Sequence, residues 1–573
     1  MSTTISEPLP RSEVRVEDTW DLTSLFADDD AWKTAFAKWE ESIPHFTTFQ
    51  GTLGRSAARL REFIDFDNEF SRTGDRLYCY ASLRNSEDVA ATTALEMISR
   101  MRNAFSRAGQ AAAYFQPEVM EIPTETMAEF IKSPELEKFK ITLDRILRYK
   151  PHTLSQAEER LLAMQAEMAS TAGSVFRVLN DSEMSFPSIR DERGSEMKLS
   201  HAGFSRCLHS ADRRVRKEAF ETYYSAYDLR KGTIAATLNG SIQRDIYYSK
   251  VRNHPSALES ALFTDNIPVS VYDSLIASVH KYLPAVHHYY DVRKRAMGLN
   301  DIHHYDTYVP ILSDLQKRIE WDEAVSIVLK SLEPLGSEYV GALEKGFNSR
   351  WCDRYENKNK RSGAFSSGMY DSYPYILMNY QPDVLDHVFT LTHEAGHSMH
   401  SWYSVRNQPY HLYHYVIFVA EVASTFNEQL LSRYLQENAA DDRERAYLIN
   451  REIDAIRGTL VRQTMFAEFE KITHALAEAN EPLTVDRFRS EYRKLLDAYF
   501  GPNFVVDAQL ELECLRIPHF YNAFYVYKYA TGISAAIALS ERVVNGGQQE
   551  LSDYLSFLKG GCSKWPLELL QDA

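Results

Sequence analysis

The sequence predicts a mostly α-helical protein, and three observations support this prediction. From about residue 28 to 170 the chain is rich in Ala, Met, Leu, Glu and Arg, with little Pro or Gly inside segments such as 86–115 and 155–171. Only two stretches, 182–198 and 375–380, have the pattern of strands. The helical texture resumes after the first of these stretches, at 211–228, 232–250, 268–297 and 315–346.

The best candidate for a domain boundary lies near residue 200. Ordered structure is expected to begin at Trp20–Phe26, and helices follow. Within 182–198 a Gly-containing turn separates two short strand-like runs, which predicts a hairpin. We therefore expect an N-terminal helical region with a short hairpin, 1–200, and a second domain, 201–573. No linker rich in Gly, Ser or Pro marks the boundary.

Composition excludes several classes of function. A net charge of −16 over 573 residues argues against nucleic acid or an anionic membrane as the main partner. The five cysteines are scattered, and no pair has zinc-ribbon or redox spacing, which is typical of reduced thiols. No charged and apolar leader pattern opens the sequence, and no run reaches the ~18 apolar residues of a membrane span. A soluble, cytoplasmic protein is expected, while the oligomeric state stays open.

The motif His393-Glu394-Ala-Gly-His397 is the strongest indication of chemistry. Asp383 is a candidate N-cap, and apolar residues follow it mostly at helical spacing, so the motif is expected on a helix. Residues four apart share one helix face, so two imidazoles can bind one metal ion while Glu394 handles a water molecule. By itself so short a motif occurs by chance in roughly a few per cent of chains this long.

A second predicted helix, 416–430, supplies the missing ligand. Glu421 lies among apolar residues there, and a carboxylate in such a stretch is costly unless it is paired or binds a metal. Glu421 is therefore the expected third ligand. Glu428 lies two turns further along the same face, where it could hydrogen-bond a ligand imidazole, or serve only as a solvated or capping residue.

His400 competes with Glu421 for the role of third ligand. It lies three residues beyond His397, on the same predicted helix. A single straight helix cannot readily place three imidazoles at tetrahedral angles around one ion. We therefore expect His400 to pack near the site and not to bind the metal.

A strand-like run, Tyr375–Tyr380, follows a Gly/Ser loop and precedes the motif helix. A strand beside a peptidase active site can pair with an extended substrate backbone, which gives affinity with little side-chain selectivity. The alternative is an ordinary buried strand.

With these residues in view, the chain resembles the thimet-oligopeptidase-like family of zinc peptidases. The likeness includes the motif, Glu421 placed 24 positions after His397, and the stretches 17–26, 253–258 and 363–380. It covers nearly the whole chain. The resemblance implies a two-lobed helical body around a deep substrate channel, with a small β element near one zinc ion. The ligands of that ion would be His393, His397 and Glu421.

The stretch Arg516–Gly532 adds to the resemblance, because the family uses a His and tyrosines from this segment to stabilise the oxyanion. The role is carried over to His519 and Tyr525, with Tyr527 next. The stretch has four tyrosines, and at least two of them are expected to serve packing. Where some relatives have a Cys in the Gly/Ser loop, this chain has Ser366-Ser367, so thiol dependence is not expected.

The resemblance implies a zinc endopeptidase that cuts internal bonds of short unfolded peptides, with Glu394 as general base toward a zinc-activated water. Two alternatives stay open. One is an exopeptidase of the same family that releases dipeptides from the carboxyl end. The other is a non-catalytic helical protein that binds peptides.

Overall fold

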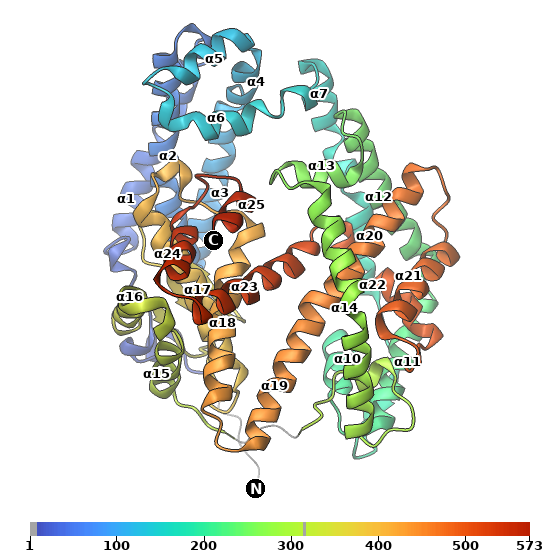
Figure 1. Cartoon of the computed structure of the whole chain (residues 1–573). Coiled ribbons are helices and arrows are strands. Elements are labelled where there is room, and N and C mark those ends of the chain that lie inside the picture. Colours follow the sequence, from blue (N-terminus) through green and yellow to red (C-terminus); the bar gives the residue numbers. More distant parts are fainter. Residues whose placement is uncertain (1–7, 313–316) are drawn as a thin grey trace. The chain divides into compact units, whose positions relative to one another are not determined.

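The computed structural model describes residues 8–312 and 317–573, and this part of the chain is mostly helical, as predicted (Figure 1). The first residues of the sequence, in which no leader was expected, lie outside the described residues, as does the start of the helix expected at 315–346. None of the helices in the described ranges is long and apolar enough to cross a membrane.

The chain forms two compact units, each built from separate stretches of sequence. Unit 1 comprises Met1–Lys150, Gln316–Asn438 and Ala535–Ala573. Unit 2 comprises Pro151–Leu315 and Ala439–Ser534. The predicted division into 1–200 and 201–573 does not coincide with these units. A boundary inferred from local texture does not record which distant segments pack together.

Unit 1 contains one small sheet of three strands. The central strand is β5 (Tyr375–Leu377), which pairs in parallel with β3 (Cys352–Asp353) and antiparallel with β4 (Phe365–Ser367). Strand β4 therefore lies at an edge. The helices of unit 1 are α1 (Asp29–Glu40), α2 (Ala57–Glu87), α3 (Thr92–Ala112), α4 (Phe115–Glu121), α5 (Thr124–Lys132), α6 (Lys140–Leu147), α15 (Trp321–Ser331), α16 (Gly336–Asn348), α17 (Asp386–Asn407), α18 (Ile417–Glu437), α24 (Gln548–Lys559) and α25 (Pro566–Asp572).

The N-terminal helices hold this sheet in place. Tyr375 and Leu377 of β5 belong to the buried hydrophobic cluster that contains Trp20 and Trp32. The Tyr375 hydroxyl also donates a hydrogen bond to the backbone carbonyl of Asp21, at 2.6 Å. Because β4 also contacts α17, the core of unit 1 supports the sheet against that helix.

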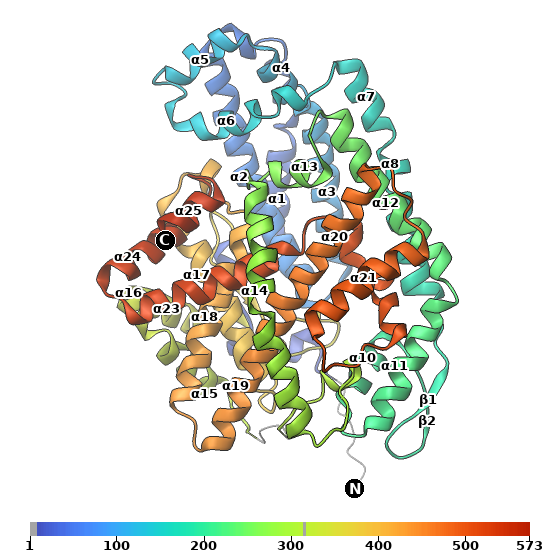
Figure 2. The same ribbon diagram turned by 45° about the vertical axis from the view of Figure 1, so that its right-hand side comes forward.

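Unit 2 contains the predicted hairpin, formed by β1 (Ser188–Arg190) and β2 (Glu196–Lys198), with Gly194 at a φ of 80° in the turn (Figure 2). Its long helix α14 (Val269–Ala296) packs against α20 (Arg462–Glu478) and α21 (Val485–Phe500). The other helices are α7 (Gln156–Met164), α8 (Ala166–Ala169), α9 (Thr171–Arg177), α10 (His201–Leu208), α11 (Arg213–Asp228), α12 (Lys231–Val251), α13 (Ala257–Phe263), α19 (Asp442–Ile456) and α22 (Glu513–Arg516); α23 (Tyr527–Asn545) begins in unit 2 and ends in unit 1.

Local backbone chemistry breaks two of the long helical segments expected from composition. Within 86–115, Asp88 separates α2 from α3, because its carboxylate accepts a hydrogen bond from the Ala90 amide and so competes with the helix. Within 315–346, Pro334 lacks an amide proton and Gly336 adopts a φ of 84°, which separates α15 from α16.

Candidate metal centre and catalytic site

Two closely packed helices of unit 1, α17 and α18, carry the candidate metal ligands. Gly396 lies at their contact. A Cβ added to Gly396 would stand 2.6 Å from both the carbonyl oxygen of Ala423 and the Cα of Ser424. Only glycine leaves room for the backbone of α18 at this point. The glycine inside the motif thus allows Glu421 to approach the two histidines of α17.

We expect Gly396→Ala to weaken both the fold and the metal site. The new methyl group would meet backbone atoms that cannot rotate away, so α17 and α18 would have to separate. Overpacking of this kind costs about 1–3 kcal/mol of the free energy of unfolding. Thermal unfolding and metal titration would measure both effects. Gly109→Ala, at a helical glycine with open space around it, is the matched control, and parent-like metal affinity in Gly396→Ala would contradict this account.

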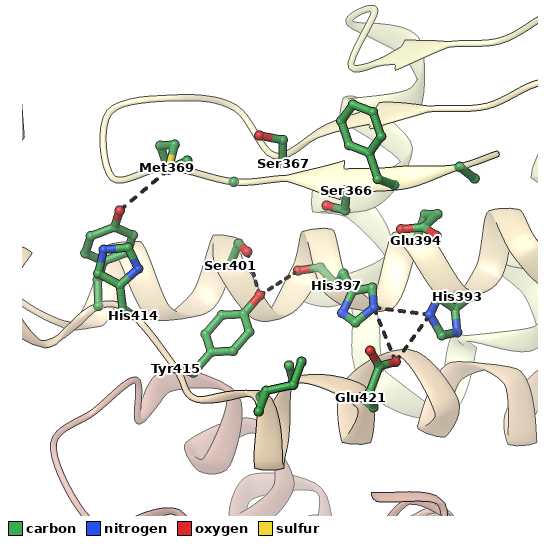
Figure 3. Close-up of a pocket in the computed structure, with 16 residues that line it drawn as sticks. Ser366, Ser367, Met369, His393, Glu394, His397, Ser401, His414, Tyr415 and Glu421 are labelled. Atoms are coloured by element: carbon green, nitrogen blue, oxygen red, sulfur yellow. Dashed lines mark hydrogen bonds and ion pairs between the residues drawn. The ribbon is translucent and has the colours of Figure 1, made fainter. Parts of the chain in front are cut away.

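The ligand atoms of the three expected residues face one point (Figure 3). The Nε2 atoms of His393 and His397 are 3.1 Å apart. The Oε2 atom of Glu421 lies 3.5 Å from the first and 3.6 Å from the second. A tetrahedral zinc ion with bonds of about 2.0–2.1 Å would separate its ligand atoms by roughly 3.4 Å. The spacing therefore fits such an ion.

Further hydrogen bonds prepare both imidazoles to bind a cation. Nδ1 of His393 lies 2.7 Å from Oε1 of Glu428, and the ring of His397 bonds to the backbone of Ala420. When each ring donates its proton in these bonds, both Nε2 lone pairs point toward each other and toward Glu421. A cation at their common focus would relieve that repulsion. Of the two roles left open for Glu428, the structure therefore shows the contact with the imidazole of His393.

The electrostatics of the two rings favour the same conclusion. Burial lowers the pKa of His397 to about 3, so this ring is neutral and able to bind a metal at neutral pH. Burial also disfavours a charged His393, but Glu428, Glu394 and Glu421 together raise the pKa of His393. Three carboxylates around one imidazole attract a positive charge, whether it is a proton or a metal ion.

Glu394 stands beside the ligands without belonging to their group. It is 7% exposed, and burial raises its pKa to about 7, although a hydrogen bond from the Ser366 backbone and the neighbouring His393 oppose the increase. A carboxyl group with a pKa near neutrality can both accept and return a proton. This is the behaviour expected of the general base assigned from the motif.

The strand available to a substrate is β4, and the prediction that Tyr375–Tyr380 pairs with substrate is wrong. Both edges of β5 are already occupied, by β3 and β4. The other edge of β4 pairs with no strand in the described residues, and residues 364–369 line the pocket at the metal site. The side chains of Ser366 and Ser398 are 2.8 Å apart and connect β4 to α17. Sequence pattern could locate a strand but could not tell a central strand from an edge.

The pocket has a volume of about 560 Å³, and Tyr415 lines it opposite β4 (Figure 3). The Tyr415 hydroxyl lies 2.8 Å from Oγ of Ser401 and donates to the carbonyl oxygen of His397, at 3.5 Å. Sequence reasoning did not single out Tyr415. The signal for it was its position two residues before the helix that carries the third ligand.

His400 packs behind this tyrosine, as predicted. Its ring stacks on Tyr415, with centroids 3.7 Å apart and an interplanar angle of 9°. His400 is 1% exposed and lies outside the group of possible metal ligands among the described residues. Burial lowers the pKa of His400 to about 3, so the stacked ring is uncharged.

In unit 2, His519 and Tyr525 share one surface. Their rings stack with centroids 6.2 Å apart and an interplanar angle of 13°. Tyr529 is edge-on to Tyr525, at 5.4 Å, so the structure adds a third side chain to this cluster. His519 is exposed, and the two tyrosines are half-buried.

The other two tyrosines of the segment are packing residues, which meets the expectation that at least two would be. Tyr521 stacks on Phe176, at 4.2 Å, and its hydroxyl is 2.8 Å from that of Thr237. Tyr527 is fully buried and lies 5.1 Å from the ring of Tyr272. This burial argues against the contact with substrate that the resemblance implied for Tyr527.

Comparison with known proteins identifies the family. A model of peptidase family M3 matches residues 206–573, and one described as oligopeptidase F matches residues 118–186. This chain belongs to peptidase family M3. It is 42% identical to Oligopeptidase PepF of Bacillus subtilis, over 98% of this chain and 84% of that protein. Group B oligopeptidase PepB of Streptococcus agalactiae is 36% identical, over 98% of this chain and 94% of that protein.

Solved structures agree with this assignment to family M3. The crystal structure of oligoendopeptidase-F from Enterococcus faecium has a TM-score of 0.72 and 34% identity, with 95% of this chain and 94% of that one covered. The crystal structure of a protein from Chlamydophila abortus has a TM-score of 0.94 and 36% identity, with 99% of this chain and 95% of that chain covered. The resemblance argued from the motif and Glu421 is confirmed, and the M3 chain is a metalloendopeptidase.

Proposed function

We propose that this M3 peptidase is a zinc-dependent oligoendopeptidase that hydrolyses internal bonds of short, unfolded peptides. The observation that carries the proposal is the convergence of three ligand atoms, all within 4.8 Å of one another, on one point beside the buried Glu394. The names of the relatives, which include oligopeptidases and oligoendopeptidases, support short peptides as the substrate class.

Two imidazoles and one carboxylate are a ligand set typical of catalytic zinc, which keeps a fourth position for water. In the proposal His393, His397 and Glu421 hold one ion. When bound, zinc supplies Lewis-acid activation of water and of the scissile carbonyl. Glu428 supports the site by orienting the His393 ring through its hydrogen bond.

Glu394 moves the protons in the proposed reaction. Its carboxylate takes a proton from the attacking water and then delivers that proton to the leaving amine nitrogen. Burial raises the pKa of Glu394, which makes its carboxylate a stronger base toward water. His519 and Tyr525 are proposed to donate hydrogen bonds to the oxyanion of the tetrahedral intermediate, a role carried over from the family. Removing one such donor should cost roughly 10²–10³-fold in turnover.

The substrate backbone is proposed to pair with the free edge of β4. Such pairing uses backbone amides and carbonyls, which all peptides share, and therefore holds many sequences in an extended form. Extended binding also explains a preference for unfolded peptides. The net charge of −16 supports the proposal that neither nucleic acid nor an anionic membrane is a partner. A cytoplasmic location is proposed because all five cysteines are free thiols, as is usual in a reducing compartment.

A quenched fluorogenic peptide blocked at both ends tests the proposal. We expect cleavage that a chelator abolishes and that added zinc restores, since blocked termini leave an exopeptidase nothing to hold. Mass spectrometry of the products would locate the internal bond. Release of dipeptides from an unblocked peptide, without cleavage of the blocked one, would replace the proposal with an exopeptidase. Failure to cleave either peptide would favour a non-catalytic peptide-binding protein.

A further inference from the structure

The residue before Tyr525 has an unusual backbone conformation. Phe524 has a φ of 59°, in the left-handed region that bulky L-residues rarely adopt. It lies in the short connection between a 3₁₀ turn, Pro518–Tyr521, and helix α23. A residue stays in such a conformation only when its surroundings hold it there.

A buried carboxyl group makes the contact that holds it. Glu470, on α20, is 2% exposed, and its Oε1 accepts a hydrogen bond from the Phe524 amide at 3.2 Å. Its second oxygen, Oε2, has no hydrogen-bond partner within the described part of the chain. Burial raises the pKa of Glu470 well above its ordinary value. The hydrogen bond to the loop is thus what compensates for burying this group.

The same helix also holds the Phe524 side chain. His474, one turn after Glu470 on α20, has its ring 4.6 Å from that of Phe524, and the ring of Tyr272, on α14, lies 6.0 Å from it. At the start of the connection, Arg244 donates a hydrogen bond to the carbonyl oxygen of Tyr521, at 3.2 Å. The connection is therefore anchored at two points, and Tyr525 follows the second anchor directly.

We infer that Glu470 is a positioning residue: its hydrogen bond keeps Phe524 in the left-handed conformation that places the Tyr525 ring beside His519. A change in the φ of Phe524 from positive to negative would redirect the chain at Tyr525 and separate the two rings. The inference rests on the proposed role of Tyr525 in stabilising the oxyanion. Glu470 itself is too deeply buried to touch a substrate.

Two substitutions of Glu470 separate positioning from packing. Glu470→Gln keeps an acceptor oxygen within reach of the Phe524 amide, so it should retain at least about half of the parent kcat. Glu470→Asp withdraws the carboxyl by about 1.5 Å and breaks the bond. It should lower kcat about 10–100-fold, less than the roughly 10²–10³-fold supplied by one whole oxyanion donor. KM and zinc content should stay within about twofold of the parent values. If Glu470→Asp is too unstable to assay, Glu470→Met should show the same loss of kcat, because its side chain also offers the Phe524 amide no oxygen acceptor.

A double-mutant cycle with Tyr525→Phe decides the mechanism. If Glu470 acts through Tyr525, then Glu470→Asp should lower kcat by less than about threefold further once the hydroxyl is gone. The inference would be overturned if the fold losses in kcat of the two single variants simply multiplied in the double variant. It would also be overturned if Glu470→Asp alone kept a parent-like kcat. Both outcomes would leave the role of Tyr525 intact. A parent-like kcat for Tyr525→Phe alone would instead overturn the proposed donor, and the inference with it.

Discussion

Glu394→Gln is expected to lower kcat by roughly 10³–10⁴-fold while zinc remains bound. The amide has the shape of the carboxyl group but cannot take a proton from water. The ligand group consists of His393, His397 and Glu421, so the substitution leaves the metal ligands unchanged. Turnover of the blocked fluorogenic peptide and zinc content per chain, measured on the same preparation, provide the test.

Glu394→Asp is the matched control for this prediction. It keeps a proton acceptor but moves it back by about 1.5 Å, so part of the activity should survive. The assignment of Glu394 would be wrong if the Gln variant kept more than about a tenth of the parent kcat with normal zinc content. A Gln variant that lost its zinc would show instead that Glu394 supports the metal site.

Glu421→Gln should weaken zinc binding by at least about 10²-fold and remove activity at limiting zinc. Zinc sites bind with about 10–16 kcal/mol shared among four ligands, so one ligand contributes on the order of 3 kcal/mol. The substitution removes the one negative charge among the three expected ligands. Competition against a chelator of known affinity would measure the change, and excess zinc should restore part of the turnover.

Glu428→Gln is the comparison for Glu421→Gln, because both residues lie on α18 and face the same imidazole. Glu428 touches His393 on the side away from the ligand focus, and loss of such a supporting contact typically costs 10–100-fold in metal affinity. We therefore expect a smaller loss of zinc than for Glu421→Gln. The reverse order of affinities would exchange the roles assigned to the two glutamates.

The sequence was sufficient to predict the candidate metal centre because the geometry of that group is set by helical periodicity. His393 and His397 lie one turn apart, so any helix through them presents both rings on one face. Glu421 and Glu428 repeat this logic two turns apart on α18, and the structure places one beside Nε2 and the other beside Nδ1 of His393. The apolar residues around Glu421 selected it as the expected ligand, and the family resemblance then agreed with that choice.

The rest of the site depends on contacts between residues that are distant in sequence. Whether β5 or β4 offers a free edge depends on β3, which precedes β4 by more than ten residues and pairs with the far side of β5. Gly396 matters only because the backbone of α18 lies against it. The units, too, are assembled from separated stretches, which local composition near residue 200 could not indicate.

By itself, the sequence determined the helical class and predicted the two helices that carry the candidate ligands and the candidate general base, since these predictions rest on local spacing and composition. Tertiary structure alone decided which tyrosines of the C-terminal segment serve packing and which lie beside His519. Tyr527 is buried against Tyr272 and Tyr521 stacks on Phe176, whereas Tyr525 lies beside His519. Burial is a property of what packs against a residue, and those partners lie hundreds of positions away along the chain.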